Sequence, residues 1–175
     1  MTANFRHNNT GWTLQRGFGE MVWIALIFVS VTACRSGEDS PGAKIRATIE
    51  RAEAFAEAKD LGGLKDLLSD AYRDDAGQDK RAILGLLFVQ FRRHESIHLL
   101  TRIDRLDIQP AQAAVTVFTA MAGRPIPGAS ALPALRADLY RFDLTFAEEG
   151  GAWRVASSTW RPAKLNDFFP SEAAD

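Results

Sequence analysis

The sequence has very little cysteine, and this scarcity excludes two ways of stabilising a small protein. Cys34 is the only cysteine among the 175 residues. One thiol cannot form a disulfide within the chain, and it cannot supply a cysteine cluster for structural zinc. The folded part of the chain must therefore be held together by packing of its hydrophobic core.

A long apolar run and an excess of one charge are also missing. The apolar run at residues 21–33 has 13 residues, whereas a helix that spans a membrane needs about 20. After that run, 19 basic residues stand against 21 acidic ones, a net charge of −2. Such a near-neutral balance has no electrostatic footprint for nucleic acid, and no nucleic-acid partner is expected.

The apolar run and the cysteine that follows it are the most informative feature of the chain. Residues 21–33 carry no charge, Cys34 comes directly after them, and Arg35 begins a polar stretch. The length of the run fits the central region of a secretory signal peptide. Arg6 and Arg16 supply positive charge upstream of it. The alternative is an ordinary secreted protein in which Cys34 is a free thiol.

Val31-Thr32-Ala33-Cys34 resembles the lipobox of bacterial lipoproteins. In that family the signal is cut before the cysteine, whose sulfur then carries a diacylglycerol. The resemblance implies a signal peptide at residues 1–33 and a membrane partner reached through lipidated Cys34. No aspartate follows Cys34, which in the enterobacterial sorting rule implies the outer membrane, facing the periplasm. The expected organisation is then a tether at 34–43, a domain at 44–162 and a C-terminal tail at 163–175.

The first half of the expected domain has helical patterning. Ser40 followed by Pro41 is typical of a helix start, and apolar residues recur at helical spacing to about Lys59. Asp60 can cap a second, short helix. Asp79 can cap a third helix, which runs to about residue 93 and whose apolar set is wide enough for a central core helix.

The second half alternates between apolar and polar residues, as half-buried strands do. The alternation from Ile97 to Ile108 changes phase near Asp104, which predicts a bulge in a long, bent strand. Further strands are expected at 115–121, 140–146 and 153–161, with a hairpin turn at 149–151, an irregular connection at 123–135 and a loose tail from Asn166. Helices followed by antiparallel strands predict an α+β fold, with the helices on one face of a curved sheet.

Two segments carry a resemblance to a known superfamily. The helical residues 52–61 with Leu67-Leu68-Ser69-Asp70, and the closing residues 153–162, resemble the nuclear transport factor 2-like superfamily, which shares its architecture with cystatin-like folds. The resemblance implies a cone-shaped domain with a pocket at its open end. The superfamily includes ketosteroid isomerase, scytalone dehydratase, polyketide cyclases and many non-catalytic modules, so fold alone does not choose a function.

The resemblance directs attention to polar and aromatic residues that can reach the pocket. Asp74 is the candidate catalytic base, with Tyr72 or Tyr140 beside it, as in isomerases that use a carboxylate. The alternative is that Asp74 makes a turn and Tyr140 is a core residue whose hydroxyl reaches water. The expected pocket is lined by Tyr72, Phe88, Phe91, Tyr140, Phe142 and Trp160.

His94-Glu95-Ser96-Ile97-His98 matches the H-E-x-x-H pattern of zinc peptidases. Two histidines four residues apart share a face only if they lie on one helix. The alternation that begins at Ile97 instead places His98 on a strand, and no further histidine follows. The expectation is a solvated helix-to-strand junction without metal, and no cofactor is expected elsewhere.

The other face of the predicted sheet indicates a second kind of partner. Ala114, Thr116, Phe118 and Ala120 share one face and are not strongly polar, so a homodimer can form there unless the 123–135 connection and the tail cover it. The sequence thus favours a lipid-anchored, non-catalytic domain that binds a small apolar ligand or a protein. The alternative is an isomerase, dehydratase or cyclase that uses Asp74, and the third is a zinc peptidase.

The anchor prediction is tested by Cys34→Ser. Because the sulfur carries the lipid, this change should abolish labelling by a radioactive fatty acid and move the protein into the soluble fraction, or leave its signal unprocessed. Labelling and membrane fractionation identical to those of the unsubstituted protein would show that Cys34 is not lipidated.

Overall fold

The computed structural model describes Asp39 to Phe169. Cys34 and the predicted signal peptide lie outside these residues. The elements are α2 (Pro41–Glu57), α3 (Leu61–Leu67), α4 (Lys80–Arg93), β1 (His98–Gln109), β2 (Gln112–Ala122), the 3-10 helix η1 (Ala129–Ala131), α5 (Leu132–Leu135), β3 (Asp138–Glu149), β4 (Ala152–Pro162) and the 3-10 helix η2 (Leu165–Phe168).

The three predicted helix starts are confirmed, each by a side chain that accepts a hydrogen bond from a free backbone N–H. Ser40 accepts from the amide of Ala43 at 3.2 Å, and Asp60 accepts from that of Gly63 at 3.0 Å. Asp79 does the same at the start of α4, at 2.8 Å. Such caps stabilise a helix by about 1 kcal/mol each.

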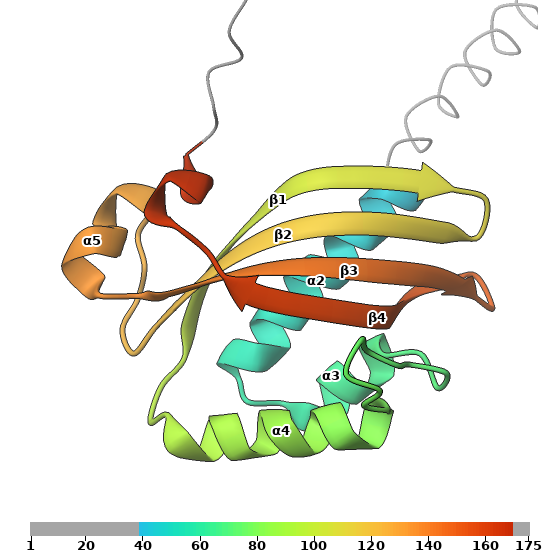
Figure 1. Ribbon diagram of the computed structural model, residues 1–175, viewed down its shortest axis with the longest axis horizontal. Helices are drawn as coiled ribbons and strands as arrows, with labels where there is room; N and C mark the ends of the chain where they lie inside the picture. The colour runs from blue at the N-terminus through green and yellow to red at the C-terminus, as the bar shows by residue number, and fades with distance from the viewer. Residues whose placement is uncertain (1–38, 170–175) are drawn as a thin grey trace, which may run out of the picture. The chain divides into compact units, whose positions relative to one another are not determined.

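The four strands form one antiparallel sheet in the order β1-β2-β3-β4 (Figure 1). The predicted phase change is a register shift between Ile103 and Arg105 in β1. The predicted hairpin turn joins β3 to β4 through Gly150 and Gly151, whose φ angles are +59° and +82°. Glycine adopts such positive φ angles without the steric cost that other residues meet. The predicted α+β fold is confirmed.

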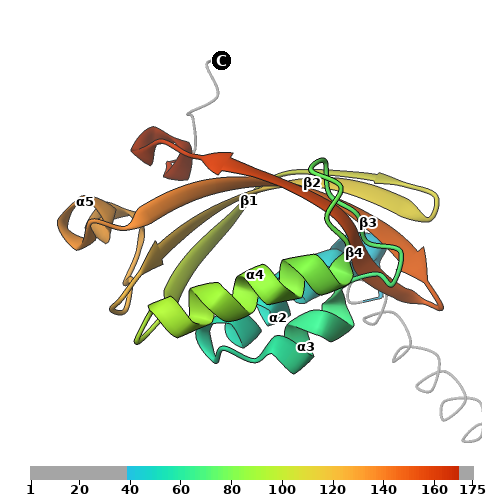
Figure 2. The same cartoon turned by 60° about the horizontal axis from the view of Figure 1, so that its bottom comes forward.

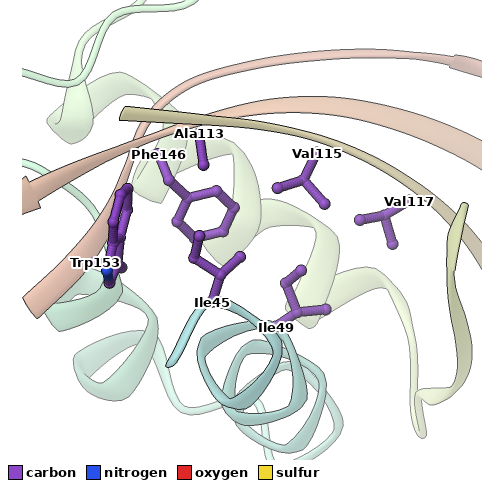
Figure 3. Packing of buried hydrophobic residues seen from close by; sticks show 7 residues of the cluster. All are labelled: Ile45, Ile49, Ala113, Val115, Val117, Phe146 and Trp153. Atoms are coloured by element: carbon purple, nitrogen blue, oxygen red, sulfur yellow. The ribbon is translucent and has the colours of Figure 1, made fainter. Parts of the chain in front are cut away.

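Helices α2, α3 and α4 lie on the concave side of the curved sheet (Figure 2). Helix α2 packs directly on that face: Ile45 and Ile49 lie against side chains of β2, β3 and β4 (Figure 3). The buried members of this concave-face cluster are Ile45, Ile49, Ala113, Val115, Val117, Phe146 and Trp153. Ile45 and Phe146 are wholly shielded from solvent, so the centre of the core lies between α2 and β3.

The convex face of the sheet carries a second cluster. Phe118 and Ala120 of β2 are buried there together with Leu132 of α5 and Phe168 of η2. Figure 1 shows α5 and η2 at the same end of the sheet. The chain from Asn166 was expected to form a loose tail, but it continues as η2 to Phe168 because the ring of Phe168 packs 6.0 Å from that of Phe118.

The expectation that α4 is a central core helix is wrong. Phe91 is its only buried residue, and Phe91 packs with Leu64 of α3 and with Ile97. Leu86, Phe88 and Val89 are exposed to 48%, 51% and 43%. Apolar residues occupy a wide part of the α4 surface, as the sequence indicated. Only the side that carries Phe91 is buried against neighbouring elements.

All the buried residues of these clusters lie between Ile45 and Phe168. A chain that begins at Arg35 therefore keeps the whole of the described core and is suitable for measurements in solution. Among residues 39–169, no helix combines the length and the apolar character that crossing a membrane requires.

The contact of α2 with α3 leaves little room for a side chain at one glycine. A Cβ at Gly63 would lie 2.6 Å from the ring of Phe55, whereas a Cβ at Gly85 in α4 would have no atom within 4 Å. In the chain from Arg35, Gly63→Ala should lower the free energy of unfolding by about 1–3 kcal/mol through overpacking. Gly85→Ala is the matched control and should raise it by about 0.5–1 kcal/mol. Urea unfolding measures both free energies. An equal increase in the free energy of unfolding for the two variants would contradict the close α2–α3 packing.

Candidate ligand-binding surface

Three aromatic side chains gather where β3 begins and β4 ends. Tyr140 and Phe142 alternate with polar residues on β3, and Phe142 is paired in register with Trp160 on β4. The Tyr140 ring lies 5.8 Å from that of Trp160 in an edge-to-face contact and 6.3 Å from that of Phe142. Phe142 packs against the concave-face cluster. Tyr140, Phe142 and Trp160 are called the aromatic cluster below.

The aromatic cluster is incompletely buried. Trp160 is exposed to 60%, while Tyr140 and Phe142 are half-buried. Helix α2 covers the part of the concave face around Phe146 and leaves these rings accessible. The three neighbouring rings therefore leave apolar surface in contact with solvent.

The Tyr140 hydroxyl has no hydrogen-bond partner among residues 39–169. Partial burial raises the pKa of Tyr140 above its usual value, and the negative charge of Asp138 adds to that effect. The hydroxyl is therefore a neutral donor across the physiological range. It can orient a ligand that carries a hydrogen-bond acceptor.

Tyr72 occupies a different place from the one predicted. It is only 2% exposed, and its hydroxyl lies 2.6 Å from that of Ser158 on β4. Burial raises the pKa of Tyr72, an effect that the hydrogen bond with Ser158 opposes. Tyr72 is thus a structural residue that connects the segment after α3 to the sheet. Its partner Ser158 is two residues before Trp160 on β4.

The candidate base Asp74 belongs to a turn. Its Oδ1 atom accepts a hydrogen bond from the backbone amide of Gln78 at 2.7 Å, and its own amide donates to the Gln78 carbonyl at 3.1 Å. A carboxylate used in this way closes the loop before α4. The contacts of Asp74 match the turn alternative rather than the role of a proton acceptor.

Phe88 and Phe91 are not part of the aromatic cluster. Phe91 is buried beside α3, and Phe88 lies at an open groove of about 430 Å³. The residues lining this groove are Lys59, Leu61, Phe88, Phe91, Arg92 and His94. The six residues predicted to line one pocket therefore divide among the aromatic cluster, the helix groove and the buried Tyr72 contact.

The H-E-x-x-H residues are not arranged as a zinc site. Helix α4 ends at Arg93, so His94 is its C-cap and His98 opens β1. Lys59 holds this junction by donating hydrogen bonds to the carbonyls of His94 and Glu95. Within residues 39–169, no three His, Cys, Asp or Glu side chains are grouped so that they could hold a metal ion.

The convex face is less open than the homodimer prediction assumes. Phe118 and Ala120 are covered by α5 and η2, and Thr116 is buried and donates to Asp143 at 2.7 Å. A hydrogen bond from Arg141 lowers the pKa of Asp143, so this carboxylate is ionised and paired at neutral pH. Ala114 is the one residue of the predicted patch that is exposed.

Sequence reasoning missed two residues near the aromatic cluster. Ser158 is the partner of Tyr72, and Asp138 is the charge beside Tyr140. The alternation of β3 was a usable signal for Asp138, because residues 138 and 140 face the same side of a strand. No comparable signal identified Ser158, since Tyr72 lies 86 residues earlier in the chain.

Comparison with solved structures places this architecture among known folds. The chain is similar to a candidate dehydratase of the NTF2-like family from Streptomyces avermitilis (15% identity, TM-score 0.53, 69% of this chain and 94% of that one). It is also similar to a protein of unknown function with a cystatin-like fold from Nostoc punctiforme (9% identity, TM-score 0.56, 69% and 89%).

A third similar structure is Bd1075 of Bdellovibrio bacteriovorus (10% identity, TM-score 0.56), where the match covers 69% of this chain but 40% of that one. No family model and no curated protein matches the sequence. The chain has the NTF2-like, cystatin-like fold. At these identities the likeness extends to the fold alone.

The two tyrosines should respond differently to loss of the hydroxyl. Tyr72→Phe leaves Ser158 without its partner beneath a buried ring and should cost about 1–3 kcal/mol of unfolding free energy. Tyr140→Phe removes a hydroxyl that no described residue uses and should change stability by less than about 0.5 kcal/mol. Urea unfolding of both variants makes the comparison, and a large loss for Tyr140→Phe would assign that residue to the core.

Proposed function

We propose that this protein is a lipoprotein of the bacterial cell envelope whose NTF2-like domain binds a small apolar ligand without catalysing a reaction. The anchor rests on the lipobox-like residues 31–34, and outer-membrane placement rests on the absence of aspartate after Cys34. The proposed binding surface is the aromatic cluster on the concave face of the sheet.

The single observation that carries the binding role is the exposure of Trp160. An indole ring exposed to 60% beside two further aromatic rings leaves apolar surface in contact with water. Covering an aromatic side chain contributes about 1.5–3 kcal/mol. The Tyr140 hydroxyl at the same place adds one polar contact, which is the usual composition of a small-molecule site.

The non-catalytic role is supported by the side chains around the cluster. An isomerase or dehydratase of this fold would need a carboxylate at the pocket, and that of Asp74 is engaged with the backbone of Gln78. The β3 residues that line the concave face, from Tyr140 to Phe146, are uncharged. The similarity to a candidate dehydratase keeps catalysis as the second candidate function, with Asp138 as the carboxylate whose charge acts on Tyr140.

A fluorescent probe tests the proposed surface. The chain from Arg35 should bind the neutral, apolar N-phenyl-1-naphthylamine with quenching of tryptophan emission. Trp160→Ala should weaken binding roughly tenfold to a hundredfold, because it removes the largest exposed ring. Ile108→Ala is the matched control, since Ile108 is an exposed apolar residue at the other end of the sheet.

Equal affinity of Trp160→Ala and the unsubstituted chain would contradict the proposed surface. Asp74→Asn changes the turn before α4 and should leave probe binding unchanged. The result of the Cys34→Ser experiment decides the anchor separately, because the chain from Arg35 lacks that residue.

A further inference from the structure

Helix α4 presents an exposed face that no described element covers. Nine of its fourteen residues are exposed, namely Arg81, Ala82, Gly85, Leu86, Phe88, Val89, Gln90, Arg92 and Arg93. None of these nine is acidic, and only Gln90 is polar without being charged. The middle of the face is apolar and both ends are basic.

The contacts that hold α4 in the fold leave this face unoccupied. Phe91 and Leu87 pack toward α3, and the Lys80 ammonium donates to the Leu68 carbonyl and pairs with Asp70 at 2.8 Å. Leu86, Val89 and Arg93 follow one another at spacings of three and four, so they share the opposite side of the helix. A solvent-facing helix surface that is apolar in its middle is expected to have a partner.

We propose that the exposed face of α4 binds the surface of an anionic lipid bilayer. Leu86 and Val89 would enter the boundary between headgroups and acyl chains, as the apolar face of an interfacial helix does. Arg81 at one end and Arg92 and Arg93 at the other would meet lipid phosphates, and guanidinium groups bind phosphates in a bidentate manner. The helix would lie in the plane of the membrane.

The helix groove beside this face is also lined by apolar and basic side chains. Phe88 and Arg92 belong both to the exposed face and to the groove, which Leu61 also lines. His94 and Lys59 are the remaining polar residues there, and the Lys59 ammonium is occupied by backbone carbonyls. The groove thus extends the basic and apolar surface toward α3.

Charge argues against a second copy of the chain as the partner. In a two-fold symmetric pair each α4 would face another α4. Both ends of the exposed face are basic, so either relative direction would bring arginines together without a carboxylate from this face. The nearest acidic residues along the chain are Asp79, which is the N-cap of α4, and Glu95, beyond its C-terminus.

The proposed anchor at Cys34 would also hold the domain near a membrane, and the role of α4 is proposed independently of it. Six residues separate Cys34 from Pro41. A chain of that length spans at most roughly 25 Å, so lipidated Cys34 would keep the domain close to a bilayer. The exposed face of α4 is a different surface from the proposed ligand site at the aromatic cluster.

Vesicle sedimentation tests the inference with the chain from Arg35, which lacks Cys34. The chain should sediment with vesicles of equal parts phosphatidylcholine and phosphatidylglycerol at low salt, and remain in solution with phosphatidylcholine alone. Arg92→Gln with Arg93→Gln should lower partitioning roughly thirtyfold, because each basic residue near an anionic surface adds about fivefold. Arg46→Gln with Arg105→Gln removes the same charge elsewhere and should have little effect.

The apolar contribution is tested by Val89→Glu, which should abolish sedimentation. Ile108→Glu is its matched control because Val89 and Ile108 are equally exposed, at 43%, and it should sediment like the unsubstituted chain. Absence of sedimentation with anionic vesicles, or equal losses in the two variants, would overturn the proposal. A dimer detected by light scattering and dispersed by Val89→Glu would also overturn it. Probe binding at Trp160 should be unaffected in every variant.

Discussion

The packing of α2 on the concave face of the sheet is the contact on which the rest of the fold depends. Ile45 and Phe146 are wholly shielded from solvent at its centre. Complete burial of such side chains contributes about 1.5–3 kcal/mol each, and the domain has no disulfide to replace that contribution. Helix α3 is then held against α2 by the approach of Gly63 to Phe55, and α4 is held against α3.

The same contact decides where a ligand can bind. Helix α2 crosses the concave face: Ile45 lies in the cluster with Phe146, and the C-terminal half of the helix packs with Leu99 of β1 and Met121 of β2. The aromatic cluster lies on β3 and β4, outside this path. Helix α4 packs on α3 through Phe91, and no described helix buries the Trp160 indole. The candidate site is therefore a part of the core face that the helices leave uncovered.

The convex face is shaped by a different kind of packing. Phe118 has two guanidinium groups near its ring. The Cζ atom of Arg102 lies 5.1 Å from the ring centre, and that of Arg141 lies 6.0 Å from it. Such cation–π contacts stabilise the Phe118 ring on the convex face, next to the charged side chains of the two arginines. The cover provided by α5 and η2 completes the burial of Phe118, and it removes most of the apolar patch that the alternation in β2 had suggested as an interface.

Local patterns determined the secondary structure of this protein. Ser40, Asp60 and Asp79 identify the helix starts, and the phase change near Asp104 identifies the bulge, because capping and alternation are properties of neighbouring residues. Only the tertiary structure decided which of the apolar surfaces are buried. Contacts between residues distant in sequence determine which surfaces are buried. Ser158 forms a hydrogen bond with Tyr72, and Phe168 covers Phe118. Helix α4 packs one side on α3 and leaves Val89 exposed to solvent. An amphipathic pattern states that a surface is apolar, but which partner covers it depends on the packing of the whole chain.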